Sequence, residues 1–281
     1  MKKIDIHCHT SDRAIEDVLD PDASTLNIIT LMQKHDIKYT VLLATYFPHK
    51  QSGISNFRLL NWIDHSWIRG SEHNFLMFGS LDFEHYFYQG YNELRELAIM
   101  GKIHGIKIYT CYQDINIISK KFETIMKLAE LYKLPVMFHA GVSYAAYRKY
   151  GKKTIARMYG ANELVWVAKK YPNINFILSH LSKPDFGSMV DVAKHTPNVY
   201  SDVSGLIDSK HNAEEIPECI ENVKIFVSEV GPSKLLFGTD FPVQSHEHSI
   251  QFVEEGMAGY SRKDRCLVYY DNAARLLKLY K

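Results

Sequence analysis

The sequence has little of what marks several common protein classes. Its four cysteines are widely spaced and form no Cys-x-x-Cys pair, so neither a disulfide framework nor a zinc knuckle is indicated. No apolar run approaches the roughly 20 residues of a membrane span, and the N-terminus lacks the apolar stretch of a signal peptide. The 33 Lys and Arg against 32 Asp and Glu give a net charge of +1, without the basic surplus of proteins that bind nucleic acid or anionic membranes. These absences predict a cytoplasmic protein that binds a small-molecule substrate rather than nucleic acid or a membrane. They do not decide whether the protein forms a homo-oligomer.

Short apolar runs are the main feature that is present. Eight near-continuous runs predict parallel strands buried on both faces. They cover residues 4–8, 39–44, 75–81, 105–109, 135–139, 175–179, 199–203 and 234–238. Amphipathic segments separate them, and a repeat near 30 residues is typical of a βα unit. Eight such units close most economically into a (β/α)8 TIM barrel, here one domain over residues 1–281. The alternative is an open doubly wound sheet, whose nucleotide-binding form has no support because no Gly-x-Gly-x-x-Gly follows a strand.

Two connections after predicted strands are longer than a tight loop. They span residues 46–57 and 141–160, and active sites of barrels are built from such connections. In the second, Arg148 is a candidate for holding a substrate carboxylate through its forked guanidinium, with Tyr144 beside it. A solvated run of loop charges is the alternative interpretation. At the other end of the chain, residues 271–277 predict a terminal helix with Asp or Asn near its start.

Histidine is unusually frequent, with 14 in the chain, and several histidines end predicted strands. His7 and His9 project to one side because strand side chains alternate, which leaves Cys8 in the core. His139, His180 and Asp240 end the fifth, sixth and eighth runs. In a barrel these ends converge on one mouth, which predicts a metal site at the C-terminal ends of strands 1, 5, 6 and 8. A single strand histidine is more often a core residue, so the prediction rests on the combination.

The motifs at these strand ends resemble the signature strands of the amidohydrolase superfamily. They are residues 4–10 (Ile-Asp-Ile-His-Cys-His-Thr), 138–141 (Phe-His-Ala-Gly), 178–180 (Leu-Ser-His) and 236–242 (Leu-Phe-Gly-Thr-Asp-Phe-Pro). The last motif and the Asn-Ala-Ala-Arg of residues 272–275 are similar to the amidohydrolase-related branch. The resemblance runs from residue 4 to about 277 and implies a metal-dependent barrel enzyme. Members hydrolyse amides, esters or lactones, and the branch also contains non-oxidative decarboxylases and hydratases.

The resemblance also implies roles for individual residues. His7, His9, His139 and Asp240 match metal ligands, and Asp240 matches the general base as well. His180 matches either a ligand of a second metal or a histidine that orients the attacking water. The branch is usually mononuclear, so we expect one divalent ion per chain, and imidazole with carboxylate indicates Zn²⁺.

Other residues leave alternatives open. Lys107 lies in the predicted fourth strand, where binuclear members place a carboxylated lysine or a glutamate; an unmodified lysine facing a carboxylate or a substrate anion is the alternative. Asp202 either orients His180 or caps a turn. His246, like His211 and His248, has no strand-terminal place and is expected at the surface.

Three functions follow from this sequence. The first is a hydrolase in which Asp240 takes a proton from a metal-activated water that attacks an amide, ester or lactone carbonyl. The second is a decarboxylase of an unsaturated or aromatic acid at the same site, with Arg148 or Lys107 holding the carboxylate. The third is a barrel used only for binding, which would have lost ligand positions, and none is lost.

Overall fold

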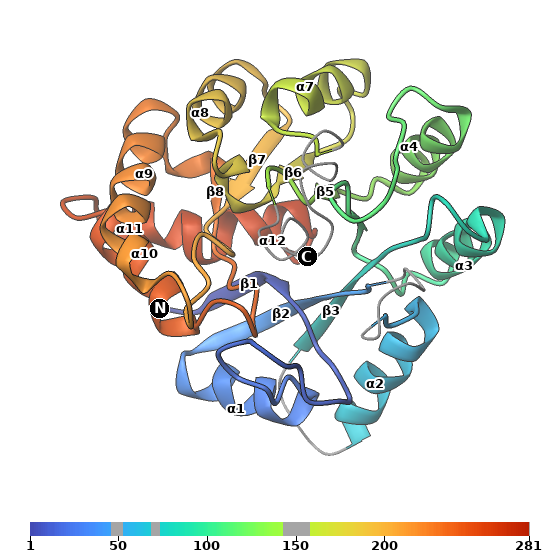
Figure 1. Cartoon of the computed structure of the whole chain (residues 1–281), viewed down its shortest axis with the longest axis horizontal. Coiled ribbons are helices and arrows are strands. Elements are labelled where there is room, and N and C mark those ends of the chain that lie inside the picture. The colour runs from blue at the N-terminus through green and yellow to red at the C-terminus, as the bar shows by residue number, and fades with distance from the viewer. Residues whose placement is uncertain (46–52, 69–73, 143–157, 281) are drawn as a thin grey trace.

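The computed structural model describes residues 1–45, 53–68, 74–142 and 158–280. Eight strands form one parallel sheet in the order β1 to β8, and helices alternate with them around its outside (Figure 1). The strands are β1 (Lys3–Cys8), β2 (Ile37–Leu43), β3 (Asn74–Gly79), β4 (Gly105–Ile108), β5 (Val136–Phe138), β6 (Phe176–Leu178), β7 (Val199–Asp202) and β8 (Leu235–Leu236). The predicted (β/α)8 barrel and all eight predicted strands are therefore confirmed. No helix in the described part of the chain is long and apolar enough to cross a membrane.

The helices bury the faces that their apolar spacing predicts. They are α1 (Thr25–Lys34), α2 (Asn56–Ile68), α3 (Phe87–Ile99), α4 (Lys120–Tyr132), α7 (Ala161–Lys170), α8 (Phe186–His195), α9 (Ile216–Glu229), α10 (His246–Gly256), α11 (Arg262–Cys266) and α12 (Asn272–Leu276). In α9, for example, Val223, Phe226 and Val227 are buried, as residues three and four apart on one helix face. Each side chain of this kind contributes about 1.5–3 kcal/mol when it leaves water.

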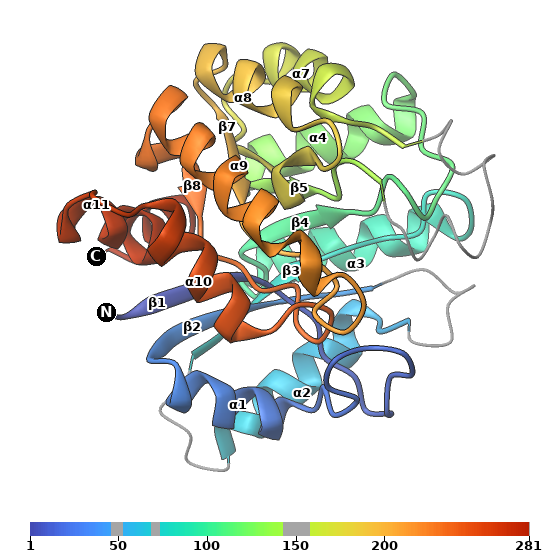
Figure 2. The ribbon, with the colours of Figure 1, turned by 60° about the vertical axis from the view of Figure 1, so that its left-hand side comes forward.

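Two apolar layers hold the barrel. The larger lies between strands and helices and includes Cys8, as expected for that residue. The smaller lies inside the barrel, where Ile4 and Leu236 pack with Ala273 and Leu276 of α12. The C-terminal helix therefore shares a core with the strands. Figure 2 shows the same arrangement from a second direction, with α10 and α11 beside the strands β1 and β8.

The terminal helix begins earlier than the sequence predicts. Helical turns start at Arg262, where Ser261 and Asp264 form a capping box, and continue through residues 267–271 into α12. Asn272 is therefore not a cap. Its buried amide donates instead to the carbonyls of Pro232 and Leu235, both at 2.8 Å, and so ties α12 to the start of β8.

The barrel closes where β8 meets β1. The two strands share no regular ladder, but main-chain hydrogen bonds join the chain just after β8 to β1. Ile6 N donates to Phe237 O at 3.0 Å, Asp240 N donates to His7 O at 2.7 Å, and His9 N donates to Phe241 O at 2.9 Å. This closure places Asp240 directly beside the two histidines of the first strand.

Candidate metal centre

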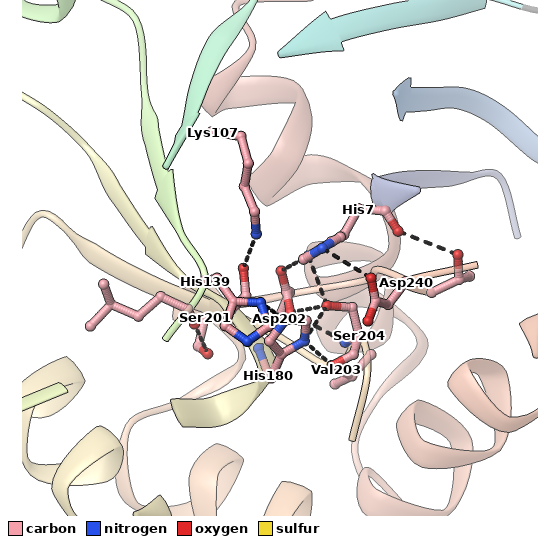
Figure 3. A network of polar contacts seen from close by, with 12 residues as sticks. His7, Lys107, His139, His180, Ser201, Asp202, Val203, Ser204 and Asp240 are labelled. Carbon is pink, nitrogen blue, oxygen red and sulfur yellow. Dashed lines mark hydrogen bonds and ion pairs between the residues drawn. The ribbon is translucent and has the colours of Figure 1, made fainter. Parts of the chain in front are cut away.

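The carboxyl ends of β1, β5, β6 and β8 bring the expected side chains to one mouth (Figure 3). His7 lies in β1, and His9 and His139 follow β1 and β5 directly. His180 lies two residues after β6. The eighth strand is shorter than predicted, so Asp240 lies four residues after it, in the segment that is hydrogen-bonded to β1.

Among the described residues two groups of three could hold a metal ion, and they share His7: one is His7, His180 and Asp202, and the other is His7, His9 and Asp240. One carboxylate oxygen, Asp240 Oδ1, lies 3.0 Å from His9 Nε2 and 3.3 Å from His7 Nε2. The ligand atoms of these three residues all lie within 4.8 Å of one another. Two imidazole nitrogens around one carboxylate oxygen match the donors of a zinc-type ion.

Buried nitrogen atoms without partners test whether a cation fits here. His9 Nδ1 and His139 Nε2 are buried and have no hydrogen-bond partner, and the buried His7 Nε2 has only Asp240 Oδ1 near it, at 3.3 Å. Buried polar atoms are normally paired, so unpaired lone pairs in one cluster favour a cation that would accept them. These donors fit a divalent ion held by His7, His9 and Asp240.

The histidine protons can be assigned from their acceptors. His180 Nδ1 donates to the carbonyl of Ser204 at 2.8 Å, because a carbonyl can only accept. A neutral His180 then presents an unprotonated Nε2, which accepts from His139 Nδ1 at 3.2 Å. That leaves His139 Nε2 as a lone pair. His180 thus orients His139 in this structure, and His139 stands next to the three-residue group rather than inside it.

Asp202 and Ser204 fix the orientation of His7. Asp202 Oδ2 lies 3.2 Å from His7 Nδ1, and its other oxygen accepts from the backbone N of His180 at 3.0 Å and from Ser204 Oγ at 2.5 Å. Asp202 also accepts from the backbone N of Ser204 at 3.2 Å, which is the predicted turn cap. Of His180, the other predicted partner, it contacts the main chain, and the ring that it contacts is that of His7. A carboxylate behind an imidazole fixes the tautomer and makes the ring a better ligand.

Sequence reasoning missed Ser204 and Gly205. Ser204 Oγ lies 2.9 Å from His7 Nδ1 and 3.1 Å from His180 Nδ1. Gly205 has a φ of +54°, and a Cβ there would lie 2.6 Å from both Asp240 Oδ2 and His180 Nδ1. A Ser-Gly pair just after a strand-terminal aspartate was the available signal, since only glycine adopts this conformation without a clashing side chain.

Charges in the mouth favour neutral rings at His139 and His180 and an ionised carboxylate at Asp240. Burial and the charge of Lys107 act to lower the pKa of His7, but Asp240 and Asp202 outweigh them and raise it. Burial lowers the pKa of His180 to about 4, and burial and His180 hold that of His139 well below its usual range. Burial acts to raise the pKa of Asp240, but the charge of His7 and hydrogen bonds from His7 and His9 outweigh it and hold that pKa well below the usual range. Both states are the ones that bind a metal ion.

Lys107 is fully buried in β4. Its Nζ donates to Ser179 Oγ at 3.2 Å, and burial lowers its pKa to about 8 against the opposing attraction of Asp202 and Asp240. Among the described residues it forms no ion pair with a carboxylate, and its carboxylation stays a prediction. It does not line the cavity in front of the histidines.

A cavity of about 220 Å³ opens in front of the group. His9, His139 and Asp240 form its floor. Tyr144 and Arg148, the two predicted substrate residues, lie outside the described residues.

His246 is buried, so its expected place at the surface is wrong. Its ring stacks on His35 with centroids 5.4 Å apart, and its Nε2 lies 3.9 Å from Asp5 Oδ2. It begins α10 directly after the cap Ser245, and the first turn of that helix packs inward. Burial lowers the pKa of His246 to about 3.

This burial makes stability depend on acidity. An unfolded histidine gains a proton near pH 6.5, whereas folded His246 stays neutral down to about pH 3, so stability falls as the pH drops below about 6.5. When the pH is lowered from 6.5 to 5, the free energy of unfolding of His246→Phe should fall by about 2 kcal/mol less than that of the wild type. Urea unfolding at the two pH values measures both. His195→Phe, at an exposed position on α8, should follow the wild type. Equal losses in all three proteins would contradict the assignment.

A closed parallel barrel with two histidines from one strand and an aspartate from another at its mouth is the architecture of a metal-dependent barrel enzyme. The chain belongs to the amidohydrolase family, whose model matches residues 4–279. The expected family is thereby confirmed. No protein of curated function matches the sequence.

Solved structures share the fold at low identity. A probable 2-pyrone-4,6-dicarboxylic acid hydrolase from Acinetobacter baumannii has 19% identity and a TM-score of 0.69, covering 99% of this chain and 100% of that one. The 5-carboxyvanillate decarboxylase of Sphingomonas paucimobilis has 14% identity and a TM-score of 0.69, covering 99% of both chains. A dihydroxybenzoic acid decarboxylase from a Polaromonas species, solved with manganese and 2-nitroresorcinol, has 16% identity and a TM-score of 0.66, covering 100% of this chain and 98% of that one.

Proposed function

We propose that the protein is a divalent-metal-dependent hydrolase that acts on an amide, ester or lactone carbonyl of a small molecule. The observation that carries the proposal is Asp240. Its carboxylate contacts both His7 and His9, is held ionised, and also borders the cavity. It can therefore contact an ion and a reacting water at the same time.

The ion is proposed to be Zn²⁺, one per chain, held by His7, His9, Asp240 and His139. Imidazole and carboxylate suit zinc, and manganese in one structure of the same fold supports a divalent ion in general. Such an ion supplies Lewis acidity, which polarises a carbonyl group and makes water more acidic. His139 lies outside the group of three, and its buried Nε2, which has no hydrogen-bond partner, supports it as the fourth ligand.

Residues of the chain transfer the proton and orient the histidine rings. Asp240 accepts the proton of the attacking water and returns it to the leaving group. Asp202 and Ser204 keep the His7 ring in one tautomer. His180 keeps the His139 ring in place through its Nε2.

Decarboxylation of an unsaturated or aromatic acid is the second candidate, and structures of the same fold from decarboxylases favour it. It requires a cation to hold the substrate carboxylate. Lys107 was one candidate for that task, but its ammonium is buried against Ser179 and does not border the cavity. Arg148, the other candidate for that task, lies outside the described residues.

An assay of the purified protein distinguishes the two reactions. Phenyl esters, γ-lactones, anilides and hydroxybenzoic acids would be supplied separately, and acid release and carbon dioxide would be measured. We expect acid release from one of the first three classes, which stops on chelation and returns with Zn²⁺. Carbon dioxide from a hydroxybenzoic acid, with no hydrolysis, would replace this proposal with the second candidate.

A further inference from the structure

The connection between β1 and α1 forms one wall of the cavity. It runs from Thr10 to Ser24, and two of its side chains, Ile15 and Val18, border the cavity opposite the metal-binding residues. They flank the tight turn at residues 16–17, where Asp17 has a left-handed φ of 59°. The turn therefore presents two apolar side chains toward the mouth.

The polar groups at the base of this loop are used inside the loop. Thr10 Oγ1 donates to the carbonyl of Ala23 at 2.7 Å, and Ser11 Oγ accepts from the backbone N of Arg13 at 3.1 Å. Main-chain bonds from Ser11 to Ala23 at 2.9 Å and from Ile15 to Pro21 at 3.0 Å close it into a compact unit. What the loop offers to a ligand is thus mainly apolar surface.

Charged contacts hold the loop on two sides. Asp12 pairs with Arg58 of α2. Asp17 Oδ1 contacts His211 Nε2 at 2.9 Å and Lys210 Nζ at 3.3 Å, in the connection that follows β7. Figure 2 shows this connection in orange beside the dark blue loop. Exposed pairs of this kind contribute little stability, but together they fix the position of Ile15 and Val18 across the mouth.

The wall continues on the other side with apolar side chains. Pro242 and Val243, just after Asp240, also border the cavity, as do the hydroxyl-bearing residues Thr45, Tyr109 and Tyr112, and no Lys or Arg occurs among its described lining residues. A volume of about 220 Å³ is below the 300–1,000 Å³ of sites for drug-sized ligands. The space therefore suits one ring or a short chain.

We propose that Ile15 and Val18 form an apolar subsite that selects substrates carrying a small uncharged aryl or alkyl group next to the scissile bond. This rests on the proposed function only in that the site binds a divalent ion. Carboxylate-bearing groups are disfavoured at this wall, because a charge would lose its hydration against apolar surface without gaining a partner.

Binding of hydroxamates tests the subsite without requiring turnover. Acetohydroxamate, benzohydroxamate and succinic monohydroxamate share one metal-binding group and differ in a methyl group, a phenyl ring and a carboxylate. With the zinc-loaded wild-type protein, calorimetry should show benzohydroxamate binding at least about tenfold more tightly than either of the others, as expected for a filled apolar pocket.

Variants in the connection between β1 and α1 test whether Ile15 and Val18 cause the preference for benzohydroxamate. Ile15→Ala and Val18→Ala should each weaken benzohydroxamate by about tenfold or more while leaving acetohydroxamate within about twofold, which also shows that fold and metal are intact. Leu19→Ala is the matched control, because Leu19 is 43% exposed and does not border the cavity. Ile15→Arg should reverse the preference toward succinic monohydroxamate.

Two results would overturn the subsite. One is equal affinity of the wild type for acetohydroxamate and benzohydroxamate. The other is an equal effect of Ile15→Ala and Leu19→Ala on benzohydroxamate. Absence of hydrolysis with normal hydroxamate selectivity would instead reject the proposed reaction and retain the subsite, so the two failures are distinguishable.

Discussion

Replacement of Asp240 by asparagine is expected to lower turnover by at least about 10², since a general base contributes about 10² to 10⁴. Asparagine keeps the size of the side chain and one acceptor oxygen, so the barrel should fold with an unchanged thermal midpoint when metal is bound. It cannot take a proton from water. Turnover per bound ion, measured on the hydrolytic substrate and corrected by elemental analysis, reports the effect.

Asp191→Asn is the control for that experiment, because Asp191 lies exposed on α8. It should keep wild-type turnover. If Asp240→Asn retains more than about a tenth of wild-type turnover with metal bound, Asp240 is not the base. His180 then becomes the candidate, and its contact with His139 would have to open during the reaction.

Replacement of His7 by alanine is expected to remove the ion. His7 Nε2 is a central donor of the group, and its neighbours are fixed at strand ends, so no other imidazole can take its place. The metal content measured by elemental analysis should fall from about one ion per chain to below about 0.1 ion per chain. Full metal content in the folded variant would reject the assignment.

Folding needs a separate control in this case, because His7 is completely buried and its loss leaves Asp202 without its ring partner. His9→Ala removes a more exposed donor of the same ion and should also lose metal. His195→Ala, on the surface of α8, should retain it.

The fold could be predicted because parallel strands that are buried on both faces have short, nearly continuous apolar sequences. Their ends were less certain. The eighth run predicted a strand to Gly238, but regular pairing stops at Leu236, because the chain turns there to join β1. The start of the last helix was also misplaced, since Asn272 serves a contact with Pro232 and Leu235 that local sequence does not reveal.

The site could be predicted where its residues end strands. The structure brings His7, His9 and Asp240 together and places His139 and His180 beside them. Their roles as ligands remain predictions. Ser204 and Gly205 left only the Ser-Gly pair after Asp202 as a signal, because they act through a turn, and burial of His246 depends on how α10 packs.

The two sides of the metal group come from the two ends of the sheet. His7 lies in its first strand and His9 directly follows that strand, whereas Asp240 follows the last strand, which has only two residues. Main-chain hydrogen bonds cross this junction, but no regular ladder does. An ion bound by these residues would cross-link the first strand and the last. Its binding free energy would then also stabilise the closed barrel. Chelation would therefore remove both the reactive group and one link between the two ends of the sheet.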